Sequence, residues 1–226
     1  SMNQLGLVEV SAVSRTRDAS DKKADITFDA SVAFNPKSTA IPYSRKGGIT
    51  SNVVVPRGGD NQFKGQAFIA NLSGEFDSVV ETHTAVIVDL GAKSKGSRAL
   101  ELQKLRRKLE DAQDKLDKAA KAKEKAKKDK ASKDKDSEAK ADKKKADKKE
   151  PKRDERAINA LLAGEKPLVA YAERATDMLE LLKLKKQFGL DLVIAGAGDA
   201  LRIAEQLAQA EVPIIYGTLR ALPSFD

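Results

Sequence analysis

The chain has 226 residues, a formal net charge of +8, one histidine and no cysteine. The lack of cysteine excludes disulfide scaffolds, thiolate zinc sites and cysteine nucleophiles, and a single histidine excludes a histidine-rich metal site. No run of 18 apolar residues occurs, so we expect no transmembrane helix, and the first residues do not have the pattern of a signal peptide.

The positive charge is confined to one segment. Residues 97–156 hold 24 basic and 15 acidic residues, whereas the rest of the chain holds 18 basic and 19 acidic residues. A basic protein is usually suspected of binding an acidic partner. Here the excess positive charge lies in an insertion, and the rest of the protein is nearly neutral.

Short apolar runs rich in β-branched residues indicate strands in the first part of the chain. We expect strands at 5–10, 49–55, 66–72 and 85–90. The segment 39–46 is typical of a short helix that stops at the Gly47-Gly48 pair.

The part after residue 166 alternates strands and helices regularly. We expect strands at 167–172, 191–195 and 212–216, and helices at 177–188 and 199–210. The strands are apolar without clean alternation, which indicates burial on both faces. This order predicts an α/β fold, part of a (β/α)₈ barrel, and the competing interpretation is a complete small doubly wound domain.

The charged segment predicts a helical arm of coiled-coil type at 97–165, between barrel segments at 1–96 and 166–226. Its apolar positions follow heptad spacing, and they are Leu102, Leu105, Leu109, Ala112 and Leu116. We expect three of them, Leu105, Leu109 and Leu116, to be buried against Ile158, Leu161 and Leu162 or against a second copy of the arm. Leu109→Lys should then loosen only the arm. Residues 118–149 are of low complexity, either a solvated helix or disordered. No aromatic side chain lies between residues 77 and 170, so nucleic-acid binding is disfavoured.

Several short motifs each have a functional and a structural interpretation. Gly196-Ala197-Gly198 follows a strand as a dinucleotide loop would, but Leu201 replaces the third glycine, so a tight turn is favoured. His83 has no recognisable catalytic partners and is expected at or near the surface. Glu173 follows the strand at 167–172 and is either a functional carboxylate or a residue that favours the start of a helix.

Loops at strand ends supply candidates for substrate binding. These are Gly58, Gly59, Gln66, Tyr171 and Arg174. For Gly58 and Gly59, which lie beside a strand end, ordinary hairpin chemistry explains the glycines equally well.

Four stretches, taken in order, carry a family resemblance. They are LGLVEVSAV, AFNPKSTAIPYSRKGGITSNVVVP, KGQAFIANLSG and KPLVAYAERATDMLELLKLKKQFGLDLVIAGAGDALRIAEQLAQAEVPII. Together they resemble the imidazolonepropionase-like branch of the amidohydrolase superfamily, over nearly all of the chain outside 97–156. The resemblance implies a metal-dependent hydrolase of C–N bonds in small cyclic amides or dipeptide-like substrates. From the same resemblance we expect the chain to be a fragment of a longer protein, one that ends before the barrel closes.

The resemblance also implies zinc or another divalent metal, but the sequence departs from the family at the ligand positions. Met2 and Gln4 stand where the family has a His-x-His pair, and Glu173 and a residue near Gly196 stand where it has two further histidines. Methionine and glutamine are poor replacements for imidazole. Two interpretations stay open: an enzyme whose metal ligands lie elsewhere, and a non-catalytic homologue that binds or assembles through its arm.

Partners and location follow from the same resemblance. We expect a small-molecule amide as substrate of an active form, and self-association through the arm. Family members of this kind are commonly exported, which favours the periplasm, although a cytoplasmic location stays open.

Overall fold

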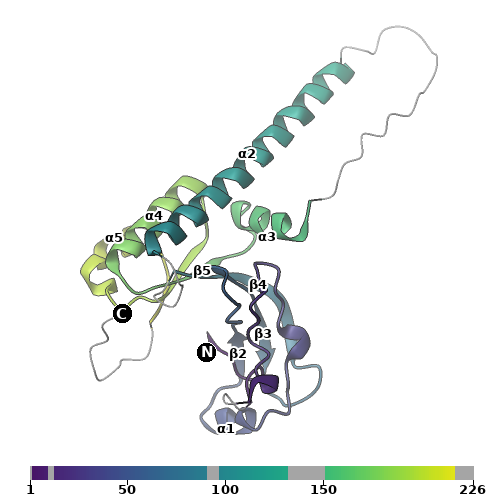
Figure 1. The fold of residues 1–226 in the computed structure, drawn as a ribbon, viewed down its shortest axis with the longest axis vertical. Helices are drawn as coiled ribbons and strands as arrows, with labels where there is room; N and C mark the ends of the chain where they lie inside the picture. The colour runs from purple at the N-terminus through teal and green to yellow at the C-terminus, as the bar shows by residue number, and fades with distance from the viewer. Residues whose placement is uncertain (1, 10–12, 91–96, 132–150, 217–226) are drawn as a thin grey trace, which may run out of the picture.

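The computed structural model describes residues 2–9, 13–90, 97–131 and 151–216, with side chains described as far as Ala122 in the long helix. Its strands form one seven-stranded sheet in chain order (Figure 1). The strands are β1 (Met2–Asn3), β2 (Ser51–Val54), β3 (Phe63–Asn71), β4 (Val79–Asp89), β5 (Leu168–Ala172), β6 (Leu192–Gly196) and β7 (Ile214–Tyr216).

Five α-helices lie between the strands along the described part of the chain. They are α1 (Ala40–Lys46), α2 (Arg98–Ala131), α3 (Arg153–Leu162), α4 (Ala175–Phe188) and α5 (Ala204–Gln209), with 3₁₀ turns at Ser14–Thr16, Ser31–Ala33 and Ala200–Ile203. The predicted order of strands and helices after residue 166 is confirmed. No helix among the described residues is long and apolar enough to span a membrane.

Six of the seven strands run in the same direction. Pairing is parallel between β1 and β2 and from β4 through β7, and only β3 runs antiparallel to its neighbours. The carboxyl ends of the six parallel strands therefore meet at one edge, which we call the carboxyl edge. In α/β folds this edge is where ligands bind.

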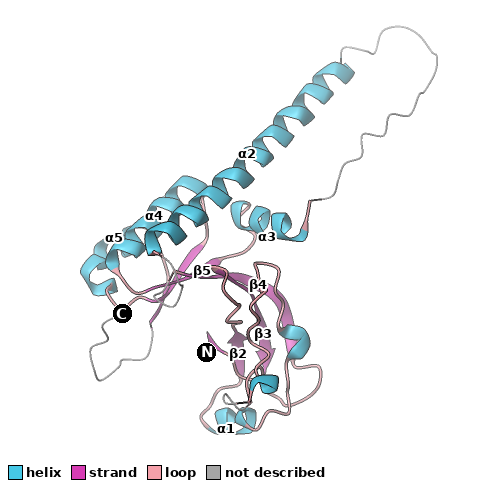
Figure 2. Cartoon of the chain, in the orientation of Figure 1, coloured by secondary structure: helices cyan, strands magenta, loops and turns pink. Residues whose placement is uncertain are grey.

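The two faces of the sheet are covered differently. The outer face packs against α2, α3, α4 and α5 in the main core cluster, which contains Leu105, Leu161, Met178, Leu168 and Ile194. The inner face carries a cluster built from strand residues, among them Val169, Ile87 and Ala195, with Val55 beside the end of β2. Helices on one face of a curled sheet are consistent with part of a (β/α)₈ barrel (Figure 2), whereas a doubly wound domain has helices on both faces.

The expected strand at 5–10 is wrong in its described part. The chain turns instead, because Gly6 adopts a φ of +81° and the Leu7 N–H donates to the Gln4 carbonyl at 3.0 Å. The Phe34 ring occupies the space beside Gly6, where a Cβ would lie only 2.3 Å from it. Leu7 packs in a satellite cluster on β2 and β3, with the partly buried Val8 against it, so these two residues reach a core without forming a strand.

The base of the charged segment is part of the main core, where Leu105 and Leu109 share a cluster with Ile158 and Leu161, as predicted. Leu105 and Leu109 are fully buried in the same cluster as Leu168 and Ile194 of the sheet. The first turns of α2 are thus the ordinary outer helix of a barrel unit rather than a separate coiled coil. Leu116 is 36 % exposed, so the expectation that it is buried is wrong.

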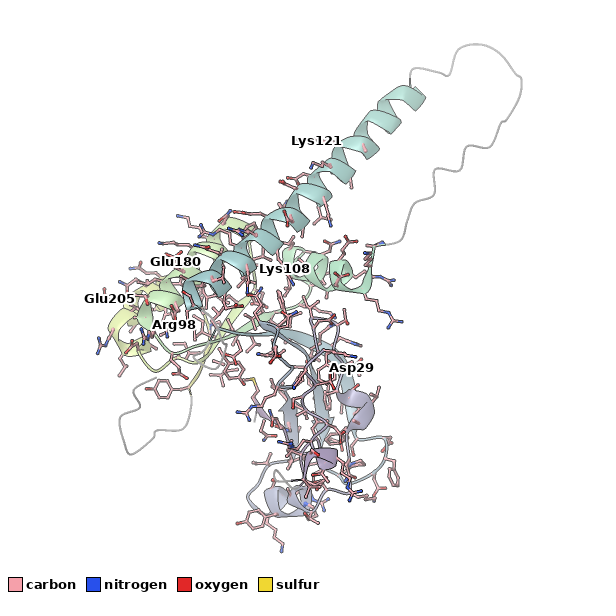
Figure 3. All side chains as sticks on the ribbon, viewed as in Figure 1. Asp29, Arg98, Lys108, Lys121, Glu180 and Glu205 are labelled. Atoms are coloured by element: carbon pink, nitrogen blue, oxygen red, sulfur yellow. The ribbon has the colours of Figure 1, made fainter. Side chains whose placement is uncertain are left out.

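Beyond its first turns, α2 leaves the body of the molecule. Residues 117–122 are exposed, and Figure 3 shows Lys121 well away from the sheet and from the other helices. The apolar stripe loses large side chains after Leu116, so nothing in this part of α2 favours packing. Most of the low-complexity segment 118–149 lies outside the described residues.

Candidate functional site at the carboxyl edge

Tyr171 and Asp89 lie side by side on the inner face at the carboxyl edge. They are register partners between β4 and β5, and the Leu90 N–H donates to the Tyr171 carbonyl at 3.1 Å. Side chains alternate along a strand, so Asp89 shares the face of Ile87, and Tyr171 shares the face of Val169. Both side chains are half-buried, which leaves them accessible from the open side of the sheet.

The surroundings of Tyr171 keep its phenol protonated. Burial raises the pKa of Tyr171 above its ordinary value, the Asp89 carboxylate raises it further, and the Arg57 guanidinium opposes the rise. Arg57 belongs to the loop after β2, and its guanidinium lies close enough to Tyr171 to act on the charge of the phenol. A neutral phenol donates a hydrogen bond, a carboxylate accepts one, and a guanidinium attracts anions.

Glu173 lies at the carboxyl edge, but its carboxylate is already engaged. The Gly198 N–H donates to Glu173 Oε2 at 2.9 Å, and the Asp199 N–H donates to the Glu173 carbonyl at 2.9 Å. In return, Asp199 Oδ2 accepts the Ala175 N–H at 3.3 Å. The loops after β5 and β6 are thereby tied to each other.

The turn after β6 is shaped around Glu173. A Cβ on Gly196 would lie 2.4 Å from Glu173 Oε1, and one on Gly198 would lie 2.8 Å from Oε2. Gly196 also has a φ of +86°, which only glycine adopts without strain. The favoured interpretation of Gly196-Ala197-Gly198 as a tight turn is confirmed.

The metal that the resemblance implies does not fit the described residues. No group of three or more His, Cys, Asp or Glu side chains converges within the part of the chain that the structure describes. Met2 contributes a thioether to the inner-face cluster, Gln4 is half-buried after β1, and Gly196 has no side chain. Glu173 alone provides a carboxylate among these four positions.

His83 stands apart from this edge. It sits in an irregular part of the β3–β4 pairing with a φ of +56°, and its Nε2 lies 3.3 Å from Asp29 Oδ2. The expectation of a surface or partly buried histidine is confirmed, because the side chain is 40 % exposed.

The predicted substrate-binding residues fall into two groups. Tyr171 and Arg174 lie at the carboxyl edge, Tyr171 on the inner face and Arg174 exposed at the start of α4. Gln66 is buried on the opposite face, where its Nε2 donates to the Ile26 carbonyl at 3.2 Å and its Oε1 accepts from Lys166 Nζ at 3.0 Å.

Gly58 and Gly59 serve the packing of their loop. A Cβ at Gly58 would lie 2.4 Å from the Lys64 backbone, and one at Gly59 would lie 2.1 Å from the Asp21 carbonyl. The loop after β2 can therefore press against its neighbours only with glycine at these positions. This holds Arg57 close to the carboxyl edge.

Sequence reasoning missed Asp89 and Arg57. Asp89 ends the apolar run at 85–90, and a carboxylate at the end of a buried parallel strand is a recognisable signal. Arg57 could be found only from the fold, because it reaches the site through a loop.

A hollow lies on the helical side of the molecule, away from the Tyr171–Asp89 pair. It measures about 1170 Å³ and is bordered by the start of α2, the outer side of α4 and the end of α5. Arg98 and Glu180, both labelled in Figure 3, line it, and Arg98 Nε lies 3.2 Å from Asp177 Oδ2. The residues that line the hollow belong to α2, α4, α5 and the segments at their ends and to none of the strands, so we assign the candidate site to the carboxyl edge.

Comparisons with known proteins bear on the fold. No protein-family model matches the chain, and no match was found among curated proteins. Among solved structures, the chain is similar to the crystal structure of an amidohydrolase from Thermotoga maritima MSB8, with a TM-score of 0.73 and 23 % sequence identity. The match covers 97 % of this chain and 56 % of that one, so the chain spans about half of its length. The two proteins share a fold.

Proposed function

We propose that this chain provides the ligand-orienting half of an amidohydrolase-like barrel acting on C–N bonds of small cyclic amides or dipeptide-like molecules, as in the imidazolonepropionase-like branch. The observation that carries the proposal is the pairing of Tyr171 with Asp89 on the inner face, beside Arg57. The shared fold with an amidohydrolase supports it.

The three side chains suit the recognition of an amide. A protonated Tyr171 hydroxyl donates to a carbonyl oxygen, and the Asp89 carboxylate accepts from an amide N–H. Arg57 adds a positive charge that favours a ligand with an anionic group. Together they fix the position and orientation of a small planar ligand against the sheet.

In enzymes of this kind a divalent metal activates water for attack on the amide carbon. The described residues do not fit such an ion, so the proposal assigns binding and orientation to them and no step of hydrolysis.

A non-catalytic binding protein is the second candidate. It is favoured by the engagement of Glu173 with the Gly198 N–H and by the pairing of the single histidine with Asp29. The one carboxylate at the family's ligand positions and the only histidine of the chain thus both have structural partners.

One experiment separates the two candidates. The chain, within the longest polypeptide that its gene encodes, is purified and tested for bound metal, for hydrolysis of 2-pyrrolidinone, hydantoin and Gly-Gly, and for binding of the same compounds. Turnover that falls at least about tenfold in Tyr171→Phe supports the enzyme. Binding without turnover or metal supports the binding protein. If no compound binds and none is turned over, both proposals fail.

A further inference from the structure

Gln62 carries a buried polar atom that has no protein partner. The residue lies between the loop after β2 and the start of β3, and it is 5 % exposed. Its Oε1 has no hydrogen-bond partner in the described part of the chain. Buried side-chain oxygens nearly always accept a hydrogen bond, so an unpaired one calls for an explanation.

The ladder between β3 and β4 places Gln62 next to Asp89. The Asp89 N–H donates to the Gln62 carbonyl at 3.0 Å, one step beyond the register pair of Phe63 and Val88. Residues opposite each other in an antiparallel pair project to the same face, with Cβ atoms about 5 Å apart. Phe63 and Val88 pack on the outer face, so alternation brings Gln62 and Asp89 to the inner face.

These residues complete a row across the carboxyl edge. Gln62 faces Asp89, Asp89 is the register partner of Tyr171, and Tyr171 is the register partner of Ala195. The row therefore presents an amide, a carboxylate and a phenol on neighbouring strands, followed by a small apolar side chain. Two of its polar groups, the buried Gln62 amide oxygen and the Asp89 carboxylate, are hydrogen-bond acceptors on neighbouring strands.

Gln66 shows what a structural glutamine in this strand does. It is buried to a similar degree, at 6 % exposure, and its amide nitrogen and oxygen both have partners in Ile26 and Lys166. Both polar atoms of one buried glutamine of this region thus have a partner, whereas the oxygen of the other has none among the described residues.

We propose that Gln62 is a ligand-binding residue, and that Gln62 Oε1 and the Asp89 carboxylate together accept two neighbouring N–H groups of one ligand. Such an edge belongs to ureas, amidines and guanidines. The inference rests on the proposed function, because it names the chemistry recognised at the same carboxyl edge. The Tyr171 hydroxyl is the remaining donor of the row, and it is available to a carbonyl oxygen of the ligand.

The test compares two glutamines by substitution with methionine, which has nearly the same length and no amide. Gln62→Met should leave the melting temperature unchanged or higher, because it removes an unpaired acceptor. Gln66→Met should lower the melting temperature, because it leaves the Ile26 carbonyl and the Lys166 ammonium group without the hydrogen bonds that Gln66 makes to them. If Gln62→Met lowers the melting temperature as much as Gln66→Met does, Gln62 has a structural partner and the inference is wrong.

Ligand binding is measured by NMR titration of the chain with methylguanidine, N-methylurea and tetramethylurea. Tetramethylurea has no N–H group and serves as the control compound. We expect at least one of the first two to shift the resonances of residues near Asp89 and Tyr171, and tetramethylurea to shift none. Preference for methylguanidine identifies a cationic ligand, and equal or stronger binding of N-methylurea identifies a neutral one.

Gln62→Met should weaken the binding of the N–H probe about tenfold, the loss expected for one hydrogen bond. Gln62→Glu keeps an acceptor and should still bind methylguanidine. Unchanged binding in Gln62→Met overturns the inference. If Tyr171→Phe weakens binding and Gln62→Met does not, the site stands and only the role of Gln62 fails. If neither probe shifts any residue of the row, the proposed site itself is wrong.

Discussion

Glu173 illustrates how one side chain can have an expected position and an unexpected role. The sequence placed it at the end of a parallel strand, and the structure confirms that position. Its carboxylate nevertheless holds the turn after β6, because the Gly198 N–H points at it across the edge. The order of residues along the chain could not reveal a bond between two loops.

Replacement of Gly196 tests this contact. Gly196→Ala should lower the free energy of unfolding by about 1–3 kcal/mol, because alanine brings both a strained positive φ and a clash with the Glu173 carboxylate. The matched control is Gly189→Ala, where φ is +66° and nothing lies within 4 Å of the added Cβ. Urea denaturation of both variants, and of Gly196→Ala combined with Glu173→Ala, measures the clash. Equal losses in Gly196→Ala and Gly189→Ala would show that Glu173 contributes nothing.

The raised pKa of Tyr171 predicts that the free energy of unfolding declines at alkaline pH. Its pKa is raised in the folded protein and returns to the ordinary value near 10 on unfolding. The unfolded chain therefore loses the proton first, so the stabilising contribution is complete below pH 10 and is lost as pH rises from there through the folded pKa. Urea denaturation of wild type and Tyr171→Phe from about pH 9 to 11 should show a shallower decline in the variant. Parallel declines would contradict the raised pKa.

At the scale of elements, the heptad spacing of α2 correctly predicted a helix with a buried apolar stripe. It did not show that the stripe packs on the outer face of the sheet. The heptad spacing predicted a helix with a buried stripe, and Leu105 and Leu109 are buried. The spacing cannot say what the stripe packs against. A coiled-coil partner and the outer face of a sheet both bury the same positions, and in this protein the sheet and α3 and α4 do so.

The depth of this packing can be measured with two leucines of the same stripe. Leu109→Ala should lower the free energy of unfolding of the whole domain by about 2–5 kcal/mol, because it leaves a cavity in the main core. Leu116→Ala should lower it by less than about 1 kcal/mol, because this side chain is already 36 % exposed. Urea denaturation followed by circular dichroism reports both. Similar small losses of stability in the two variants would show that the base of α2 is a separate arm and does not belong to the main core.

At the scale of the whole molecule, the strand and helix order after residue 166 was predictable because each element there is a regular, strongly apolar run. The first part was harder. Gly6 breaks an apolar run into a turn, and the antiparallel β3 cannot be distinguished from a parallel strand by composition. The site was only partly predictable, since Asp89, Arg57 and Gln62 meet Tyr171 through strand register and loop packing.

The distal arm should be dispensable for stability. Replacement of residues 120–150 by a flexible Gly/Ser linker should change the free energy of unfolding by less than about 0.5 kcal/mol, because residues 117–122 are exposed and belong to no core cluster. Size-exclusion chromatography with light scattering on the same variant tests self-association through the arm. If the chain self-associates through the arm, the variant should form a smaller oligomer than the wild type does. A large loss of stability would show that the distal arm packs on the domain.

The arrangement of β4 and β5 has a consequence for how the chain folds. They are neighbours in the sheet, yet all of α2, the segment after it and α3 must be spanned before they pair. The antiparallel strands β2, β3 and β4 are close in sequence and should form first. Closing the long connection is an entropic barrier that grows only logarithmically, by about 0.6 kcal/mol for each doubling of its length. Variants whose arms differ twofold in length should therefore fold at rates within roughly threefold of each other, which leaves the length of the arm free to vary.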